Sequence, residues 1–320
     1  MKETLLTLPT PVGDPLELVK FHWDGGKNGE SLSLVSGLHG DHLNGLLVNQ
    51  RLIRFLDEIA AGAHPDYQLA GRVQIFPAVN LHALASGQPT GPFDNLDMDL
   101  AFPGSLGGEA TERIAAAVLA HSSDSTYGIL LKSSATHYED APHVQCFHPD
   151  HWERKLAGHL NLSVIREIRP AATLRQQLIY QWVVADLLCY LLSAGRPGAV
   201  DSDMCDRLFS GIVAFMVKTG LVKFSGTPAD PGKSEYYRAR EEHTLFTAHA
   251  GWFLPEVVVG TGLKKGQRLG EVRDLFRGVT LEEILAPKDG MLITLRSYPV
   301  VYEKEPVATL LAERSGIWPF

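Results

Sequence analysis

The chain has 320 residues and carries 29 lysine and arginine residues against 37 aspartate and glutamate residues, a net charge of -8. This acidic balance excludes the basic surface that nucleic acid or an anionic membrane would need. The three cysteines, Cys146, Cys189 and Cys205, lie far apart, so they form neither a disulfide framework nor a zinc finger.

The N-terminus and the longest apolar stretch predict a soluble cytoplasmic protein. Residues 1–9 lack the apolar core of a secretory signal, and the stretch from Leu178 to Leu192 is interrupted by Gln181 and Asp186. A chain of this length exceeds one average domain and can bury a large core, so we expect two domains.

In chain order, apolar runs of strand length alternate with apolar residues at helical spacing. We expect strands near residues 31–36, 73–79 and 128–131 and helices near residues 43–59, 111–121 and 203–219. This alternation predicts an α/β domain over residues 1–226, with a mostly parallel or mixed sheet flanked by helices. Proline and glycine in residues 227–237 are typical of a linker. Short segments punctuated by glycine and proline then predict a small all-β domain, a sandwich or barrel, over residues 238–320.

Two histidines follow the first predicted strand, in the segment Ser36-Gly37-Leu38-His39-Gly40-Asp41-His42-Leu43-Asn44-Gly45. His39 and His42 lie where a strand passes into a helix, so both imidazoles can turn towards one point. Imidazole nitrogen is a common ligand for zinc and other first-row metals. Two ligands do not close a metal site, however, so this motif alone favours two loop histidines bonded to nearby carbonyls.

The order of motifs around this loop resembles the succinylglutamate desuccinylase and aspartoacylase family of zinc-carboxypeptidase-like hydrolases, over most of the chain. That family shows His-Gly-Asn-Glu after its first buried strand, where the His and the Glu bind zinc. Here His39 keeps the first position and His42 takes the place of the Glu. The family's later motifs correspond to Asn80-Leu81-His82-Ala83 and to Asp97-Met98-Asp99-Leu100-Ala101-Phe102-Pro103-Gly104. By equal spacing the family's substrate-binding Arg falls on Pro89, and its Asn-Arg pair falls on Asp99 and Leu100.

The same resemblance places Lys132 on the family's third zinc ligand, a histidine at the end of a strand. An ammonium group cannot bind a cation unless it loses its proton, and the reference pKa of lysine is about 10.4. Lys132 therefore replaces the charge of a metal more readily than it binds one. His137, in the loop that follows, is the nearby histidine that could restore a third ligand.

The family's catalytic base, a Glu on a late strand, falls on Ser193, and a hydroxyl cannot serve as that base. The register is open at this point, because residues 176–192 also fit one amphipathic helix closed by Gly195 and Pro197. Asp201 and Asp203 are then the remaining candidates for a carboxylate.

Two hypotheses follow for the function. The first is a non-catalytic or weakly active relative that keeps the pocket, formed by Asn80, Asp99 and Lys132, and binds a small molecule or a protein partner. The second is a working zinc-dependent hydrolase of a small amide or ester, with His39, His42 and His137 as metal ligands. A zinc amidohydrolase needs three protein ligands, a general base and a cation for the oxyanion. Loss of the base alone costs about 10² to 10⁴ in rate, which favours the first hypothesis. The sequence does not indicate the substrate, a specific protein partner or a homo-oligomer.

Overall fold

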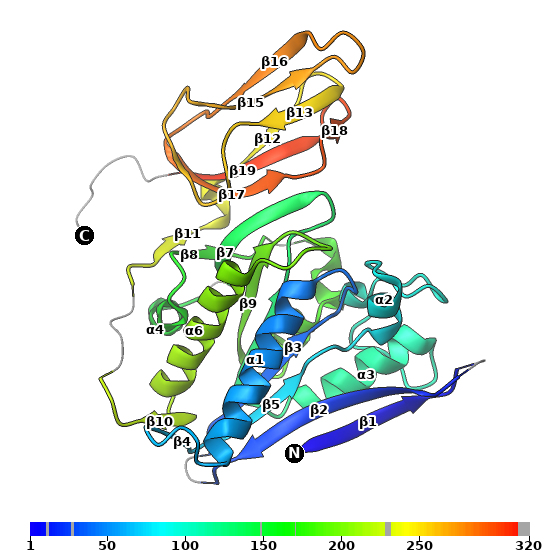
Figure 1. Cartoon of the computed structure of the whole chain (residues 1–320), viewed down its shortest axis with the longest axis vertical. Helices are drawn as coiled ribbons and strands as arrows, with labels where there is room; N and C mark the ends of the chain where they lie inside the picture. Colours follow the sequence, from blue (N-terminus) through cyan, green and yellow to red (C-terminus); the bar gives the residue numbers. More distant parts are fainter. Residues whose placement is uncertain (11–12, 27–28, 148, 170, 228–231, 313–320) are drawn as a thin grey trace.

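The computed structural model describes residues 1–320 except 11–12, 27–28, 148, 170, 228–231 and 313–320. At its centre is a long mixed sheet, drawn in Figure 1. Its strands, in spatial order, are β1 (Lys2–Leu8), β2 (Leu16–Asp24), β5 (Arg72–Phe76), β3 (Ser31–Ser36), β6 (Tyr127–Lys132), β9 (Leu188–Gly195), β7 (Tyr138–Cys146), β17 (Gly290–Arg296), β19 (Pro306–Ala312) and β12 (Glu242–Phe246).

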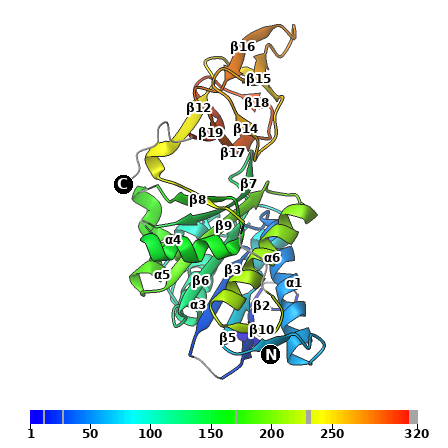
Figure 2. The same cartoon turned by 90° about the vertical axis from the view of Figure 1, so that its left-hand side faces the viewer.

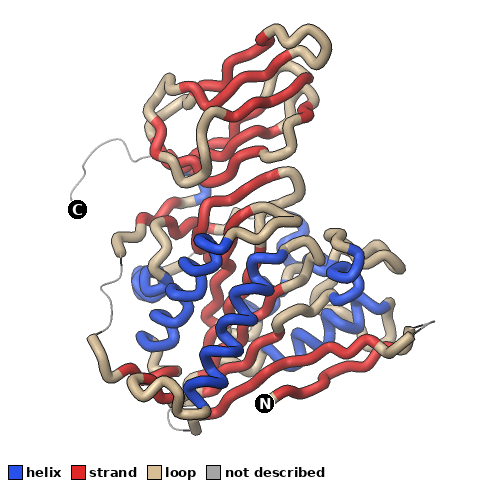
Figure 3. The backbone as a smooth tube through the Cα atoms, viewed as in Figure 1, coloured by secondary structure: helices blue, strands red, loops and turns tan. Residues whose placement is uncertain are grey.

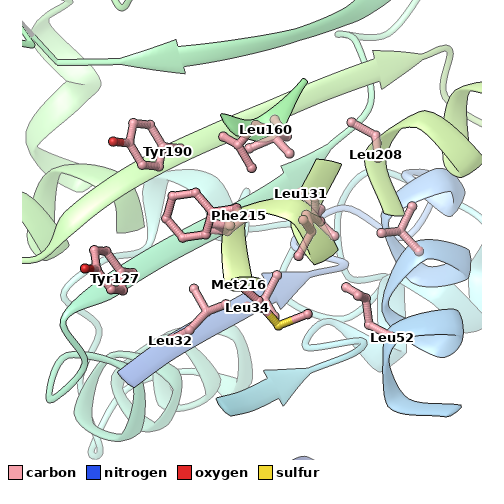
Figure 4. Close-up of a cluster of buried hydrophobic side chains, with 14 of the residues drawn as sticks. Leu32, Leu34, Leu52, Tyr127, Leu131, Leu160, Tyr190, Leu208, Phe215 and Met216 are labelled. Atoms are coloured by element: carbon pink, nitrogen blue, oxygen red, sulfur yellow. The ribbon is translucent and has the colours of Figure 1, made fainter. Parts of the chain in front are cut away.

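The four strands β5, β3, β6 and β9 run parallel to one another, and their neighbours on either side, β2 and β7, pair antiparallel with β5 and β9. Helices cover both faces of this parallel part, so its strands are buried on both sides, including the polar residues Ser33 of β3 and Gln74 of β5. The helices α1 (Leu43–Ala60), α4 (His151–Ala157) and α6 (Ser202–Lys218) pack on one face, and α3 (Ala110–Ser122) and α5 (Leu178–Val184) pack on the other. Figure 4 shows the first of these layers, where Leu34 of β3 lies in one cluster with Leu52 of α1 and Leu208 of α6.

The predicted α/β fold class is confirmed, and the six strands and helices expected in the α/β part each lie within a few residues of an observed element. One alternative is wrong: residues 176–192 are not a single helix. The chain forms α5, turns at Asp186, where φ is 61°, and enters β9. Because β9 is buried on both faces, its apolar sequence does not distinguish a strand from a buried helix.

The C-terminal strands form an additional antiparallel β unit at one end of the molecule (Figure 1, Figure 2, Figure 3). Three of them, β17, β19 and β12, continue the central sheet beyond β7, and a second sheet stacks on them around Phe253, Leu269, Leu292 and Leu310. This second sheet has the order β16 (Thr280–Leu285), β15 (Arg268–Arg273), β13 (Gly251–Pro255) and β18 (Val300–Val301).

The predicted linker 227–237 lies partly outside the described residues. Its last three residues form β11 (Glu235–Tyr237), which pairs parallel with β8 (Val164–Glu167) beside β7. The division into domains at residues 226 and 238 stays a prediction.

The remaining elements are short. They are β4 (Tyr67–Leu69), β10 (Val222–Phe224), β14 (Gly262–Leu263), α2 (Leu81–Ser86) and the 3₁₀ turns η1 (Met98–Leu100), η2 (Gly158–Leu160), η3 (Ala172–Gln176) and η4 (Ala239–Glu241). In the described part of the chain, no helix combines the length and the apolar character needed to cross a bilayer.

Candidate functional site

A cavity of about 690 Å³ opens where the parallel strands β3, β6 and β9 end. In open α/β sheets, ligands bind at these carboxyl ends of the strands. The cavity brings together six of the residues singled out from the sequence, namely His39, His42, Pro89, Asp99, Lys132 and Ser193.

The loop that carries the two histidines is held close to its neighbours by glycine. Gly37 has a φ of 74°, which side chains with a Cβ rarely adopt. A Cβ on Gly40 would lie 2.0 Å from the carbonyl carbon of Ala83, so the loop can approach α2 only with glycine at this position. The backbone N–H of Gly40 also donates to the carbonyl of Gln88 at 3.1 Å.

His39 is the centre of a hydrogen-bonded chain. Its Nε2 lies 2.6 Å from Oδ1 of Asp97, and its Nδ1 lies 3.4 Å from Nε2 of His42, with the two rings at 85°. Burial raises the pKa of Asp97, but the hydrogen bond and charge of His39 outweigh it, so the pKa lies below its usual value. Asp97 therefore fixes the orientation of His39 as a carboxylate acceptor.

His42 is 4 % exposed, and burial lowers its pKa well below 6.5, with further lowering by the nearby charges of His39 and Lys132. The imidazole is thus neutral at neutral pH. A neutral His42 can donate from Nε2 to Nδ1 of His39, or offer Nε2 as a ligand, but it does not contribute a positive charge to the cavity.

Lys132, the last residue of β6, forms an ion pair with Asp99 inside the cavity. Both side chains are largely buried, with 16 % and 11 % of their surface exposed. This pairing accounts for the charge of the lysine without a metal, because a buried ammonium is stable only when an opposite charge compensates it.

Ser193 lies beside Lys132 on β9, and its hydroxyl donates to Oδ2 of Asp140 at 2.7 Å. The other oxygen of Asp140 accepts the hydroxyl of Thr294 at 2.6 Å. Asp140 is on β7 and Thr294 is on β17, so a strand of the C-terminal unit takes part in the site. The position that the family resemblance assigns to a catalytic base thus carries a hydroxyl, which donates to the carboxylate of Asp140.

The opposite wall of the cavity joins β8 to the C-terminal unit. Arg166 and Arg169 both approach Oε2 of Glu242, at 3.4 Å and 3.5 Å. Arg169 also donates to the backbone carbonyl of Glu242 at 2.9 Å. This wall is closed by charged contacts between β8 and the start of β12.

Four residues considered from the sequence do not line this cavity. His137 is exposed in the loop before β7, where its ring stacks on Tyr298 with 4.5 Å between ring centroids. Asn80 is buried as the N-cap of α2: its Oδ1 accepts the N–H of Ala83 at 3.1 Å and its Nδ2 donates to the carbonyl of Leu38 at 3.1 Å. Asp201 is the N-cap of α6 and accepts the N–H of Met204, and Asp203 is exposed in the first turn of that helix.

The residues of the cavity do not make a complete zinc site. His39 Nδ1 and His42 Nε2 are spaced as two ligands of one tetrahedral ion, which with Zn–N bonds of about 2.1 Å lie about 3.4 Å apart. A third ligand is missing, because Lys132 is held as an ammonium by Asp99. Within the described ranges, no group of three or more His, Cys, Asp and Glu side chains is arranged to hold a metal ion.

The fold and this site define an α/β protein with a cavity that contains several charged side chains at the ends of its parallel strands, and a C-terminal β unit that forms one wall. No family model matches the chain. Among curated proteins, it is 26% identical over 300 residues to the N-alpha-acetyl-L-2,4-diaminobutyric acid deacetylase of Halomonas elongata, covering 89% of this chain and 82% of that protein.

Solved structures give the same result for the fold. The chain superposes on a succinylglutamate desuccinylase/aspartoacylase from Rhodobacter sphaeroides with a TM-score of 0.80 and 18% identity, covering 98% of this chain and 96% of that one. The product-bound ectoine utilization protein EutE (DoeB) from Ruegeria pomeroyi gives a TM-score of 0.78 and 17% identity, with 98% and 95% covered. The predicted resemblance to the succinylglutamate desuccinylase and aspartoacylase family is therefore confirmed for the fold, and in sequence the chain is similar to a curated deacetylase.

Several polar residues of the cavity are not among those predicted from the sequence, among them Asp97, Asp140 and Arg166. Asp97 lies in a motif that was identified, so its spacing from Asp99 was an available signal. Asp140 and Arg166 carry no such signal, because the pairing of β7 with β9 and β8 brings them to the site.

Proposed function

We propose that this chain is a divergent relative of the acyl-amino-acid deacylases that binds a small acylated amino acid in the cavity without a resident metal, and that it has weak or no hydrolytic activity. The observation that carries the proposal is the Lys132–Asp99 ion pair, which stands beside His39 and His42 in the same cavity. The Lys132 ammonium supports the proposal, because the family resemblance assigns this position to the third zinc ligand.

The chemistry of the remaining groups supports this proposal. Hydrolysis of an amide needs a base that takes a proton from water, and the hydroxyl of Ser193 cannot do so. A cavity rich in charged and hydroxyl groups can nevertheless recognise a small polar molecule, since a few placed polar groups fix the orientation of a ligand.

The alternative is a metal-dependent hydrolase with His39, His42 and His137 as ligands. The spacing of the first two imidazoles favours it. His137 would have to leave its stacking partner Tyr298 and enter the cavity.

Metal content distinguishes the two. We expect the purified protein to contain less than about 0.1 equivalent of zinc by plasma mass spectrometry after reconstitution, and to bind an Nα-acetyl amino acid equally in EDTA and in zinc. Lys132→His, which supplies a third imidazole, is expected to gain up to about one equivalent, because three protein ligands form a typical zinc site. Near-stoichiometric zinc in the unmodified protein, lost in the His39→Ala, His42→Ala double variant, would refute the proposal in favour of the hydrolase.

A further inference from the structure

The charged groups of the cavity are nearly all paired. Among the described residues, the acidic side chains that line it outnumber the basic ones, the two sets being Asp97, Asp99, Asp140, Glu167 and Glu242 against Lys132, Arg166 and Arg169. Lys132 pairs with Asp99, both arginines share Glu242, and Asp97 holds His39. Glu167 accepts the backbone N–H of Ala239 at 3.0 Å, towards the connection to β12.

Asp140 is the exception. It is 5 % exposed, and within the described part of the chain its carboxylate forms no ion pair and accepts only two neutral hydroxyls, from Ser193 and Thr294. A carboxylate offers about four lone-pair positions, so each oxygen retains one for a further donor. A buried charge without an opposite charge is costly, and a bound cation would relieve that cost.

The carboxylate is also held in one place. Ser193 and Thr294 belong to β9 and β17, on either side of β7, so strands from both flanks fix the two oxygens. A group whose position is fixed before binding loses less entropy when a ligand arrives. The carboxylate of Asp140 is therefore preorganised in the way expected of a group that recognises a ligand.

A second observation points to a ligand in the same cavity. The hydroxyl of Ser133, on the residue after Lys132, is 3 % exposed and has no hydrogen-bond partner among the described residues. Buried polar atoms are nearly always hydrogen-bonded, so an orphaned hydroxyl at a cavity wall indicates a partner that comes from outside the chain.

We propose that Asp140 recognises a primary ammonium group on the small molecule that the cavity binds. An ammonium group is compact and carries three donors, which suits two oxygens that each have one position left. The inference rests on the proposed function of the cavity as a small-molecule site, and it narrows the ligand to an acylated amino acid with a cationic side chain.

The test compares two ligands that differ only in the ammonium group. Nα-acetyl-L-2,4-diaminobutyrate carries it, and Nα-acetyl-L-2-aminobutyrate lacks it. By calorimetric titration, we expect the unmodified protein to bind the first at least about tenfold more tightly, because a hydrogen bond to a charged group is typically worth a tenfold change or more. In Asp140→Asn the two affinities should become equal, with the affinity for the uncharged ligand retained.

Asp186→Asn is the matched control. Asp186 is exposed at a turn with φ of 61°, a conformation that asparagine also adopts, and it does not line the cavity. This variant should keep the preference for the ammonium ligand. An unchanged preference of Asp140→Asn for the ammonium ligand would overturn the proposal. Equal binding of both ligands by the unmodified protein would also overturn it, and this comparison does not depend on the folding of a variant.

Failure of the proposed function gives a different result. If neither acylated amino acid binds, that ligand class is excluded, and the cation site is then judged with butylammonium chloride against sodium butyrate in a thermal-shift assay. A rise in Tm with butylammonium in the unmodified protein that is absent in Asp140→Asn supports the ammonium site. No rise would overturn it.

Discussion

At the scale of single residues, burial lowers the pKa of His42, in the cavity, and of His143, on β7, so that both imidazoles are neutral at neutral pH. His143, on β7, is fully buried, its Nδ1 donates to the carbonyl of Ala141 at 2.8 Å, and its Nε2 accepts from Gln145 at 3.0 Å. Burial, and then the positive charge of Arg166, lower the pKa of His143 from 6.5 to about 4. The charge of Asp140 opposes this shift without cancelling it.

This depressed pKa predicts a loss of stability in acid. Below pH 6.5 the unfolded chain takes up a proton at this position that the folded chain does not accept until about pH 4. The contribution of His143 to the free energy of unfolding is therefore fully present above pH 6.5. It falls by about 1.4 kcal/mol per pH unit as the pH drops from 6.5 to about 4. We expect the free energy of unfolding, measured with urea from pH 4.5 to 7.5, to depend less steeply on pH in His143→Gln. The difference in slope should correspond to about one proton. His151→Gln, at an exposed position on α4, should keep the full slope. Parallel curves for all three proteins would contradict this account.

At the scale of elements, α2 supports the histidine loop rather than the ligand. We expect Asn80→Ala to lower the free energy of unfolding by about 1 to 2 kcal/mol, since it removes an N-cap bond and the bond to Leu38. Urea unfolding measures this loss, and calorimetric titration at a temperature where the variant is folded should give an unchanged affinity. A weakened affinity with unchanged stability would instead place Asn80 in contact with the ligand.

The elements also explain how far the sequence could predict the structure. Apolar runs of strand length that alternate with apolar residues at helical spacing predicted β3, β5 and β6 together with α1, α3 and α6. Because His39 and Lys132 follow or end two of these strands, the same pattern predicted that they share a pocket. Asn80 also follows a strand end, but its side chain satisfies the first turn of α2 instead of facing the cavity. Local pattern cannot decide between these two uses of an asparagine, because both place it at the start of a helix.

At the scale of the whole molecule, the cavity is completed by residues far apart in the sequence. Thr294 lies 154 residues after Asp140, and the contact exists only because β17 pairs with β7 and continues the central sheet. No local spacing contains this information, since the register between two strands depends on the packing of the complete sheet. The C-terminal unit therefore acts as a wall of the site, although its sequence shows only turns and short strands.

The role proposed for Asp140 would make the C-terminal unit part of ligand recognition, and Thr294→Val tests this. The variant keeps the shape of the side chain and removes the hydroxyl that one oxygen of Asp140 accepts. We expect a loss of about 1 to 2 kcal/mol in unfolding free energy, because the carboxylate stays buried with one donor fewer. We also expect the preference for the ammonium ligand over its uncharged counterpart to change by about threefold or more, measured by titration of both, because the freed oxygen is no longer held in place. Thr309→Val is the matched control, since Thr309 is the partner of Thr294 on β19 and lines the same cavity. If Thr309→Val alters the preference as much as Thr294→Val does, the effect belongs to the wall in general, and the specific role of the Thr294–Asp140 hydrogen bond is refuted.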